Sequence, residues 1–555
     1  MSTRFPKKEV VGDLLQRRQV FRGVVEQAAG RSPTHQQPPA GEAVGPQVPL
    51  LAMIMGVHDR PQLMTLEEVQ AFGDPFTAHI LFREQVPLTL VELAAAIDGL
   101  AGEEARPLRK LYVVAEGAEF QSTVPRLPMN TRLVFTWQKD NATPPDFLLS
   151  TTTDLDDPKS LLQLIAWSET QGVFHFFERT SAGWGWAGSS LHALQDSSRG
   201  KGPFDSHING SLVMKELNEP WNHWHTMTNG IPRDLIFETV EQRNHPLFAE
   251  LTGAQELEAT VKTGVRRWTR RRVQKDLEGG QLLNLKWYAR QILWTTSVNL
   301  ISSTILSRIV ALNPEISLPN SFFFDEDGIS FAASQLSDLT VLPSNEITVL
   351  SSLYIAALDE LQVHVEASED GPSVPGDTHF AFLVPERAFE DLAVVEVLVR
   401  REVLSPRLAL CLLMVDFTNP VFSPVRAGLL PLFPESIAQG AKGAALDNMV
   451  ISEARAKLSS STQELLLLWE DQDLLGTVRR RLADYATAVQ ARLRAPDGVI
   501  DLMKLADSRK EAFRKRRLNE FRHTTSVNGA TVSHLAMRED GSVFTKNTDL
   551  SEEEK

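Results

Sequence analysis

The residues best suited to chemistry lie close together in the middle of the chain, between positions 201 and 232. This stretch contains three histidines, three acidic residues and two tryptophans: His207, His223, His225, Asp205, Glu216, Glu219, Trp221 and Trp224. Imidazole nitrogens and carboxylate oxygens bind divalent metals, whereas indole rings can wall a small-molecule pocket. The stretch therefore indicates a metal site, an acid–base pair or a ring-lined pocket.

The clearest metal-ligand pattern is the histidine pair His223 and His225. Residues two positions apart project to the same side of an extended chain, so each imidazole can offer a nitrogen to one divalent ion. A third ligand could come from His207, Asp205 or Glu216. A carboxylate in that place gives the two-histidine, one-carboxylate set of open metal centres. We therefore expect iron or zinc at these residues.

Trp221 and Trp224 alternate with the histidine pair, and we expect their rings to wall the pocket. The zincin motif H-E-x-x-H is missing, and the glutamate that follows the H-x-H strand of cupins is not found in Thr226–Gly230. Two alternatives therefore stay open. The rings can pack in a core while the imidazoles satisfy backbone carbonyl groups, or a histidine beside a carboxylate can act as a general base without a metal.

A second distinctive segment is a basic run around Trp268, within a helix that we predict from Ala254 to Gly279. Its members are Arg266, Arg267, Arg270, Arg271, Arg272 and Lys275. Guanidinium groups match carboxylate and phosphate oxygens bidentately, so Arg267 and Arg271 are candidates for binding an anionic group of a substrate. The alternative is a solvated helix face that pairs with some of the acidic residues.

A third candidate group follows an apolar run at residues 408–415, which we interpret as a buried strand. Asp416, Asn419 and Arg426 lie in the polar, proline-rich loop after this run. Loops at strand ends often carry function, so these three side chains could act together. The alternative is ordinary turn chemistry, because aspartate, asparagine and proline are common turn residues.

The composition limits the class of protein. With 555 residues, 42% of them hydrophobic, the chain can form more than one core. The single cysteine, Cys411, excludes an intramolecular disulfide framework and cysteine-rich zinc modules, and its apolar neighbours predict a core position. The net charge of −15 opposes a general affinity for nucleic acid.

The sequence also lacks the common targeting and catalytic motifs. It has no apolar run of about 18 residues, and its N-terminal segment lacks the apolar stretch of a secretory signal. We therefore expect no membrane span and a soluble, cytoplasmic protein. No phosphate-binding loop, dinucleotide fingerprint or G-x-S-x-G motif is present, so no such motif names an activity.

Composition and periodicity divide the chain into seven segments and predict a multidomain α+β fold class. In order, we expect an N-terminal amphipathic helix (1–29), a linker (30–49), a mixed, β-rich α+β domain (50–200), a Trp/His-rich, mostly helical central region (201–320), an α/β segment (321–440), a helical C-terminal region (441–522), and a terminal hairpin with a tail (523–555).

Local signals assign several elements within these segments. Thr65 and Glu68 form a capping-box pattern. We predict a helix at residues 89–100 and a short strand at residues 79–82. We predict hairpins in residues 172–188 and 531–545, the second with Asp540 and Gly541 at its turn. We predict two more in residues 322–331 and 363–384.

The leading functional hypothesis is a metal-dependent oxidoreductase or oxygenase that acts on a small organic substrate. It requires the metal ligands of the central stretch. The alternative is a noncatalytic scaffold or interaction protein, which assembles with partners or with a second copy through amphipathic helices at residues 1–29 and from Leu446 onward.

Overall fold

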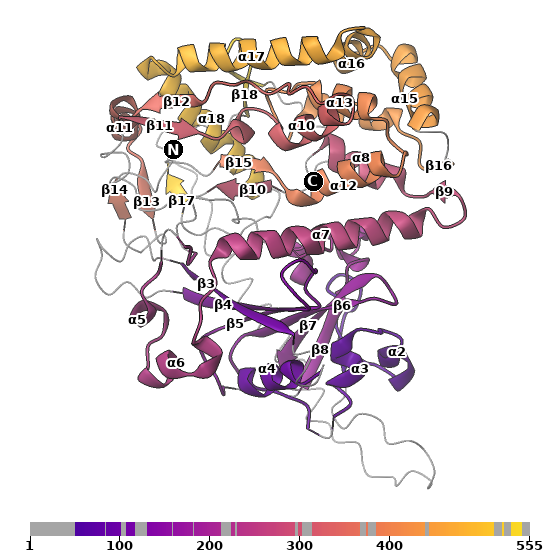
Figure 1. Ribbon diagram of the computed structural model, residues 1–555, viewed down its shortest axis with the longest axis vertical. Coiled ribbons are helices and arrows are strands. Elements are labelled where there is room, and N and C mark those ends of the chain that lie inside the picture. Colours follow the sequence, from indigo (N-terminus) through magenta and orange to yellow (C-terminus); the bar gives the residue numbers. More distant parts are fainter. Residues whose placement is uncertain are drawn as a thin grey trace. The chain divides into compact units, whose positions relative to one another are not determined.

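The computed structural model describes most of the chain between residues 50 and 546 (Figure 1). The described residues are 50–83, 85–100, 107–116, 130–157, 159–180, 183–212, 224–227, 230–294, 298–301, 314–366, 373–375, 384–438, 443–515, 524–526 and 534–546. They form two compact units. The sheet unit is drawn from Met1–Val114, Thr131–Ser211 and Pro232–Thr252, and the helical unit from Ala115–Asn130, Leu212–Ile231 and Gly253–Lys555.

The sheet unit is built on an eight-stranded mixed sheet with the order β2-β1-β8-β7-β6-β5-β4-β3. The strands are β1 (Leu51–Ala52), β2 (Gln62–Leu63), β3 (Leu108–Glu116), β4 (Asn130–Gln138), β5 (Phe147–Thr151), β6 (Leu162–Ser168), β7 (Val173–Thr180) and β8 (Gly183–Ser189). Strands β4 to β8 form an antiparallel meander, whereas β1 pairs with β8 in parallel. Together with its helices, this sheet confirms the α+β class.

Short capped helices accompany the sheet: α2 (Leu66–Gln70), α3 (Pro75–His79), α4 (Leu90–Asp98), α5 (Arg233–Ile236) and α6 (Val240–Asn244). The predicted capping box is confirmed, because the Thr65 side chain accepts from the Glu68 N–H and Glu68 accepts from the Thr65 N–H. The predicted strand at residues 79–82 is wrong. Buried Asp74 caps α3 and Pro75 begins it, so a helix ends at His79 instead.

The predicted hairpin of residues 172–188 is confirmed as β7 and β8. Its strands are longer than expected, because Thr180 pairs directly with Gly183. Large rings fill this part of the core, including Trp184, whose indole N–H donates to the Pro87 carbonyl oxygen at 2.9 Å. The aromatic residues of these strands therefore pack in the core, on both faces of the strands.

The helical unit combines long helices with short antiparallel strand pairs. Its helices are α7 (Ala254–Asp276), α8 (Leu285–Leu293), α10 (Glu326–Ser334), α11 (Ser351–Glu360), α12 (Phe389–Arg400), α13 (Pro406–Met414), α14 (Pro424–Ala427), α15 (Ala444–Ala456), α16 (Ser460–Glu470), α17 (Leu474–Arg492) and α18 (Pro496–Lys515). Its strands are β9 (Gln281–Leu282), β10 (Val298–Ile301), β11 (Glu315–Leu318), β12 (Ile347–Leu350), β13 (His364–Glu366), β14 (Ser373–Pro375), β15 (Val384–Arg387), β16 (Ile437–Ala438), β17 (Thr524–Ser526), β18 (Leu535–Met537) and β19 (Val543–Thr545).

Helix α13 lies at the centre of the helical core, and the prediction of a strand at residues 408–415 is wrong. Every residue from Leu408 to Met414 is buried, so the run shows no helical periodicity to distinguish it from a buried strand. The Ser405 side chain caps the helix and Pro406 begins it. Cys411 is buried as predicted, and burial raises its thiol pKa to about 12.

The remaining hairpin predictions differ in outcome. The hairpin at 322–331 is wrong, because Asp325 caps α10 through the Gly328 N–H and the segment is helical. For residues 363–384, β13 pairs with β14 and with β17, and residues 379–383 of the predicted second strand lie outside the described residues. The terminal hairpin is confirmed as β18 and β19, with Gly541 at a positive φ of 75°. No described helix is both long enough and apolar enough to cross a membrane.

Candidate functional site

The structure describes only part of the predicted metal site. His223, Glu216 and Trp221 lie outside the described residues. His207 belongs to the sheet unit, where its Nδ1 lies 2.7 Å from the Ser211 carbonyl oxygen. His225 belongs to the helical unit, where its Nδ1 accepts from the Ile231 N–H at 3.0 Å.

The His207 Nδ1 thus contacts a backbone carbonyl, as in the packing alternative, whereas the His225 Nδ1 accepts from a backbone N–H. Within the described residues, no group of three histidine, cysteine or acidic side chains could hold a metal ion. His207 also packs its ring against Phe176, with the ring centroids 5.2 Å apart. Trp224 is a buried side chain of the helical unit.

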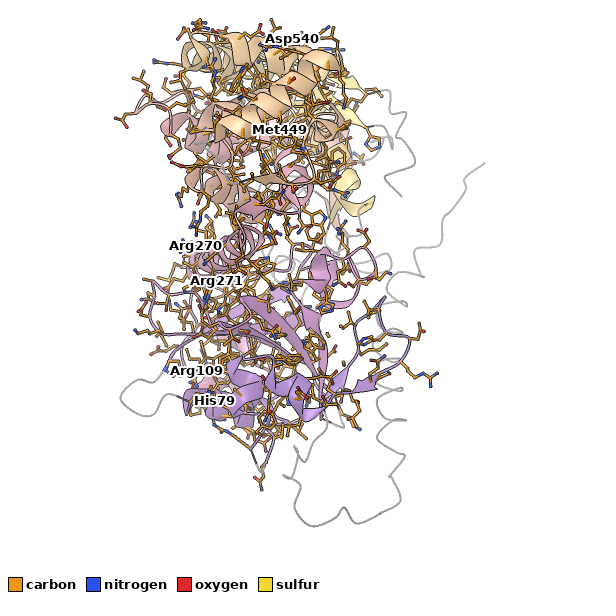
Figure 2. The ribbon with its side chains drawn as sticks, turned by 90° about the vertical axis from the view of Figure 1, so that its right-hand side faces the viewer. His79, Arg109, Arg270, Arg271, Met449 and Asp540 are labelled. Atoms are coloured by element: carbon orange, nitrogen blue, oxygen red, sulfur yellow. The ribbon has the colours of Figure 1, made fainter. Side chains whose placement is uncertain are left out.

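The basic run lies on α7, as predicted, and its arginines have different surroundings. Arg270 is exposed, whereas Arg267 and Arg271 are half-buried (Figure 2 labels Arg270 and Arg271). The arginine enclosed beside buried Trp268 is Arg272, which the sequence reasoning named only as part of the run. One turn separates the two residues, so their side chains share a helix face.

Asp416, Asn419 and Arg426 lie together in the structure, and the hypothesis that they act together in function stays a prediction. The Asn419 side-chain amide donates to Asp416 Oδ1 at 2.7 Å, and the Arg426 Nε donates to the Val415 carbonyl oxygen at 3.1 Å. Ser423 and Lys546 reach the other carboxylate oxygen of Asp416, at 2.5 and 3.4 Å. Burial lowers the pKa of Arg426 to about 10, with a further lowering by nearby Arg387.

This buried cluster acts as a clamp between segments that are far apart in sequence. Asn419 donates to the Met537 carbonyl oxygen and accepts from the Met537 N–H, and the Thr418 hydroxyl donates to the same carbonyl. These bonds hold the terminal hairpin against the loop after α13. Asp416 itself has a positive φ of 49°, a strained conformation that such a set of contacts can maintain.

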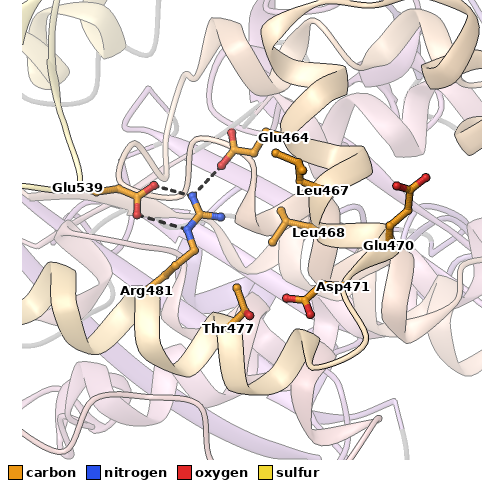
Figure 3. A pocket seen from close by; sticks show the side chains of 8 residues that line it. All are labelled: Glu464, Leu467, Leu468, Glu470, Asp471, Thr477, Arg481 and Glu539. Carbon is orange, nitrogen blue, oxygen red and sulfur yellow. Dashed lines mark hydrogen bonds and ion pairs between the residues drawn. The ribbon is translucent and has the colours of Figure 1, made fainter.

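The clamp connects to an open pocket of about 530 Å³ (Figure 3). The Asp416 N–H donates to Glu464 Oε2 at 3.2 Å, and Glu464 Oε1 accepts from Arg481 Nη2 at 2.7 Å. The pocket is lined by Glu464, Leu467, Leu468, Glu470, Asp471, Thr477, Arg481 and Glu539. Sequence reasoning did not identify it.

Two helices and the terminal hairpin position this lining. On α16, Glu464, Leu467 and Leu468 follow the three- and four-residue spacing of one helix face, and Ser459 caps the helix. On α17, Thr477 and Arg481 are one turn apart. Glu539 lies in the turn between β18 and β19, 58 residues after Arg481 in the sequence. The helix spacing is visible in the sequence, but the contribution of Glu539 is not.

The pocket carries an excess of negative charge. Arg481 Nη2 contacts Glu464 and Glu539 at 2.7 and 2.6 Å. Burial alone would lower the Arg481 pKa, but the hydrogen bonds to these two carboxylates raise it, so the guanidinium stays charged. Four carboxylates against this one guanidinium leave the lining with a net charge of −3.

The remaining lining suits an organic cation. A hydrogen bond from the Thr477 hydroxyl, together with the Asp473 N–H, lowers the pKa of Asp471 and favours its charged form. Leu467 is 74% exposed and adds an aliphatic wall. Glu470 also forms an ion pair with Arg455 at 3.0 Å. Both side chains are exposed, and such exposed pairs contribute little to stability. The leucines beside these carboxylates suit a cation that has an aliphatic stem.

No family model, curated protein or solved structure matches this chain.

Proposed function

We propose that the chain is an interaction protein whose helical unit binds a cationic, amphipathic segment between α16 and α17. The observation that carries this proposal is the combination of four carboxylates, one paired guanidinium and an exposed leucine in a single pocket. It develops the alternative in which the helices from Leu446 onward bind a partner.

The ligand class follows from the lining. Lysine and arginine have long aliphatic stems that pack along apolar surface while their charged ends reach polar groups. In this pocket, Leu467 and Leu468 would contact the stem, and Glu470 and Asp471 would receive the charge. Aliphatic neighbours in the same segment would pack beside Leu467, which gives the site a preference for an amphipathic ligand.

One segment with the required chemistry belongs to this chain. Residues 1–29, which lie outside the described residues, contain six basic and three acidic residues, hence a net charge of +3. The sequence predicts an amphipathic helix there, with Val10, Leu14 and Phe21 among its apolar positions. This segment, from the same chain or from a second copy, is the occupant that we propose.

The test is a titration of fluorescein-labelled peptide 1–29 with the full chain, followed by anisotropy. We expect saturable binding that weakens as salt is added, because exposed charges are screened. A peptide with glutamine at Arg17, Arg18 and Arg22 should bind at least about tenfold more weakly, which corresponds to about 1.4 kcal/mol. Equal binding of the two peptides would contradict the proposal.

Two protein variants complete this experiment. Leu467→Lys should weaken binding, whereas Leu458→Lys, at another exposed leucine outside the pocket, should not. A full chain that carries the same three glutamine replacements removes competition from its own segment, so it should bind the labelled peptide more tightly than the parent does. Its mass in solution, compared with that of the parent, shows whether the segment comes from a second copy.

The metal-dependent oxidoreductase hypothesis stays a prediction, because two of its proposed ligands, His223 and Glu216, lie outside the described residues. Elemental analysis of the purified parent and of a folded His223→Ala/His225→Ala variant tests it. Stoichiometric iron or zinc that is lost in the variant would support the metal site, and equal, negligible metal in both would remove that support.

A further inference from the structure

The guanidinium of Arg272 is buried between α7 and α8 with few partners. The residue is 5% exposed. Its Nη2 donates to Gln291 Oε1 at 2.7 Å, but Nε and Nη1 are buried without a hydrogen-bond partner. The amide nitrogen of Gln291 is also buried without a partner. Three donor groups with no acceptor therefore belong to two side chains that contact each other.

The aromatic neighbours stabilise the positive charge, and the Tyr288 hydroxyl lies close to the guanidinium. The Arg272 Cζ lies 4.7 Å from the centroid of the Tyr288 ring and 5.6 Å from that of Trp268, which is cation–π distance. The Tyr288 hydroxyl donates to Asp276 Oδ2 at 2.7 Å. The same hydroxyl interacts with Arg272 through charge and a side-chain hydrogen bond, but no contact to Nε or Nη1 has ordinary hydrogen-bond geometry.

The charge of Arg272 also lacks a counter-ion among the described residues, none of which brings a carboxylate to ion-pair distance. A second guanidinium lies nearby, because Arg387 Nη2 donates to the Gln291 carbonyl oxygen at 2.7 Å. Arg387 is paired with Asp325 at 2.6 Å, whereas Arg272 has no such partner. Buried charges in proteins are normally paired, and buried donors are normally hydrogen-bonded.

We infer that the helical unit binds a small inorganic anion, of the size of chloride or bromide, between Arg272 and Gln291. The anion would accept from the two unpartnered guanidinium nitrogens and from the Gln291 amide, and it would neutralise the buried cation. We infer a single small ion because these donor atoms have almost no solvent contact. This site is independent of the pocket between α16 and α17.

The test is a bromide titration of the full chain at constant total salt, with gluconate as the balancing anion because it is too large for a closed site. Binding to the folded state alone stabilises it by mass action, so the thermal midpoint should rise saturably, by about 2–4 °C. Bromide quenches tryptophan emission, so a saturable part of the quenching should follow the same curve through Trp268.

Three variants identify the site. Arg272→Met removes the cation and keeps an apolar stem, so the saturable rise and the saturable quenching should both disappear. Gln291→Glu places a carboxylate beside the guanidinium as an internal counter-ion, so this variant should also lose the bromide response even if Arg272→Met does not fold. Arg270→Met, on the exposed face of the same helix, should retain the response of the parent.

The possible results separate an anion from water, which could also fill a polar site of this kind. A bromide response in the parent and Arg270→Met, and its loss in Gln291→Glu, would support the anion. A parent whose midpoint does not depend on bromide would contradict it and leave water as the occupant. A response of equal size in the parent and Gln291→Glu would place the ion elsewhere and would also overturn the inference.

Discussion

The sheet unit and the helical unit differ in how many guanidinium groups they bury among the described residues. The largest buried groups of the sheet unit are aromatic rings, such as Trp137, Trp167 and Trp184. The helical unit buries large rings too, such as Trp268. It also buries Arg272, Arg426 and Arg509, whereas Arg179 is the buried arginine among the described residues of the sheet unit. The difference follows from how the backbone N–H and carbonyl groups of each unit find hydrogen-bond partners.

In the sheet unit, neighbouring strands satisfy most of each other's backbone groups, so rings can fill the interior. Helices instead leave carbonyl groups unsatisfied at their C-terminal ends. Arg426 donates to the Val415 carbonyl at the end of α13, and Arg407 donates to the Trp469 and Asp471 carbonyls at the end of α16. In the helical unit, therefore, buried or half-buried arginines connect helix ends, and one such end forms part of the pocket.

The largest predicted effect is on the arginine that the helical unit buries most completely. Arg426→Met keeps the volume of the stem but leaves the Val415 carbonyl without its guanidinium donor and Asp416 with less positive charge nearby. We expect a loss of about 3–5 kcal/mol in the free energy of unfolding, measured by urea titration and circular dichroism. Arg270→Met should stay within about 0.5 kcal/mol of the parent. Equal losses of stability in the two variants would contradict the distinction between buried and exposed arginines.

The second prediction concerns the sheet unit, where His175 is stacked on Phe72 and accepts from the Trp186 indole N–H at 3.2 Å. Burial, and then the charge of His192, lower the His175 pKa to about 3. The unfolded chain therefore takes up a proton near pH 6.5 that folded His175 excludes, and stability falls as the pH decreases from about 6.5 towards 3.

The variant His175→Phe should lose this part of the pH dependence. Between pH 7.5 and pH 4.5, the parent should lose about 3 kcal/mol more stability than the variant does. Buried Asp74 has the opposite effect in both proteins, because burial raises its pKa to about 6 and its contribution therefore decreases as the pH rises. Unfolding measured at several pH values gives the difference, and parallel curves for parent and variant would show that His175 is protonated in the folded state.

A smaller effect is expected at the cap of α13. Ser405→Ala removes the side-chain acceptor for the Leu408 N–H, which should cost about 1 kcal/mol at neutral pH. Burial raises the pKa of Asp447 to about 6, and hydrogen bonds from Ser405 oppose that increase. The variant should therefore raise the Asp447 pKa further, which carbon-detected NMR of the carboxyl group can measure. An unchanged pKa would mean that Ser405 acts on the helix alone.

Local signals made some of this structure predictable. The capping box at Thr65, the long helix α7 and the turn at Asp540 and Gly541 each depend on residues that are neighbours in sequence. Helix α13 was assigned to a strand because a run that is buried on every side has the same apolar pattern in either conformation. There the distinguishing signal was the Ser-Pro pair before the run.

The candidate sites were harder to predict because they depend on long-range contacts. The density of histidine and tryptophan in residues 201–232 drew attention to that stretch, but His207 and His225 belong to different units. Conversely, the pocket combines common surface residues of two helices with Glu539 of a distant turn. Carboxylates on exposed helix faces are ordinary in any sequence, so only the fold distinguishes these from the others.

The most direct test of the central claim is a charge exchange between the pocket and its proposed ligand, measured as the affinity for peptide 1–29. Glu470→Arg in the full chain, or Arg17→Glu with Arg18→Glu in the peptide, should each weaken binding about tenfold. Combining the two should restore most of the affinity, because the pair then has opposite charges again. Glu453→Arg, at an exposed position of α15 outside the pocket, is the matched control and should change little. No recovery in the combined pair, or equal effects of Glu470→Arg and Glu453→Arg, would contradict binding in the pocket between α16 and α17.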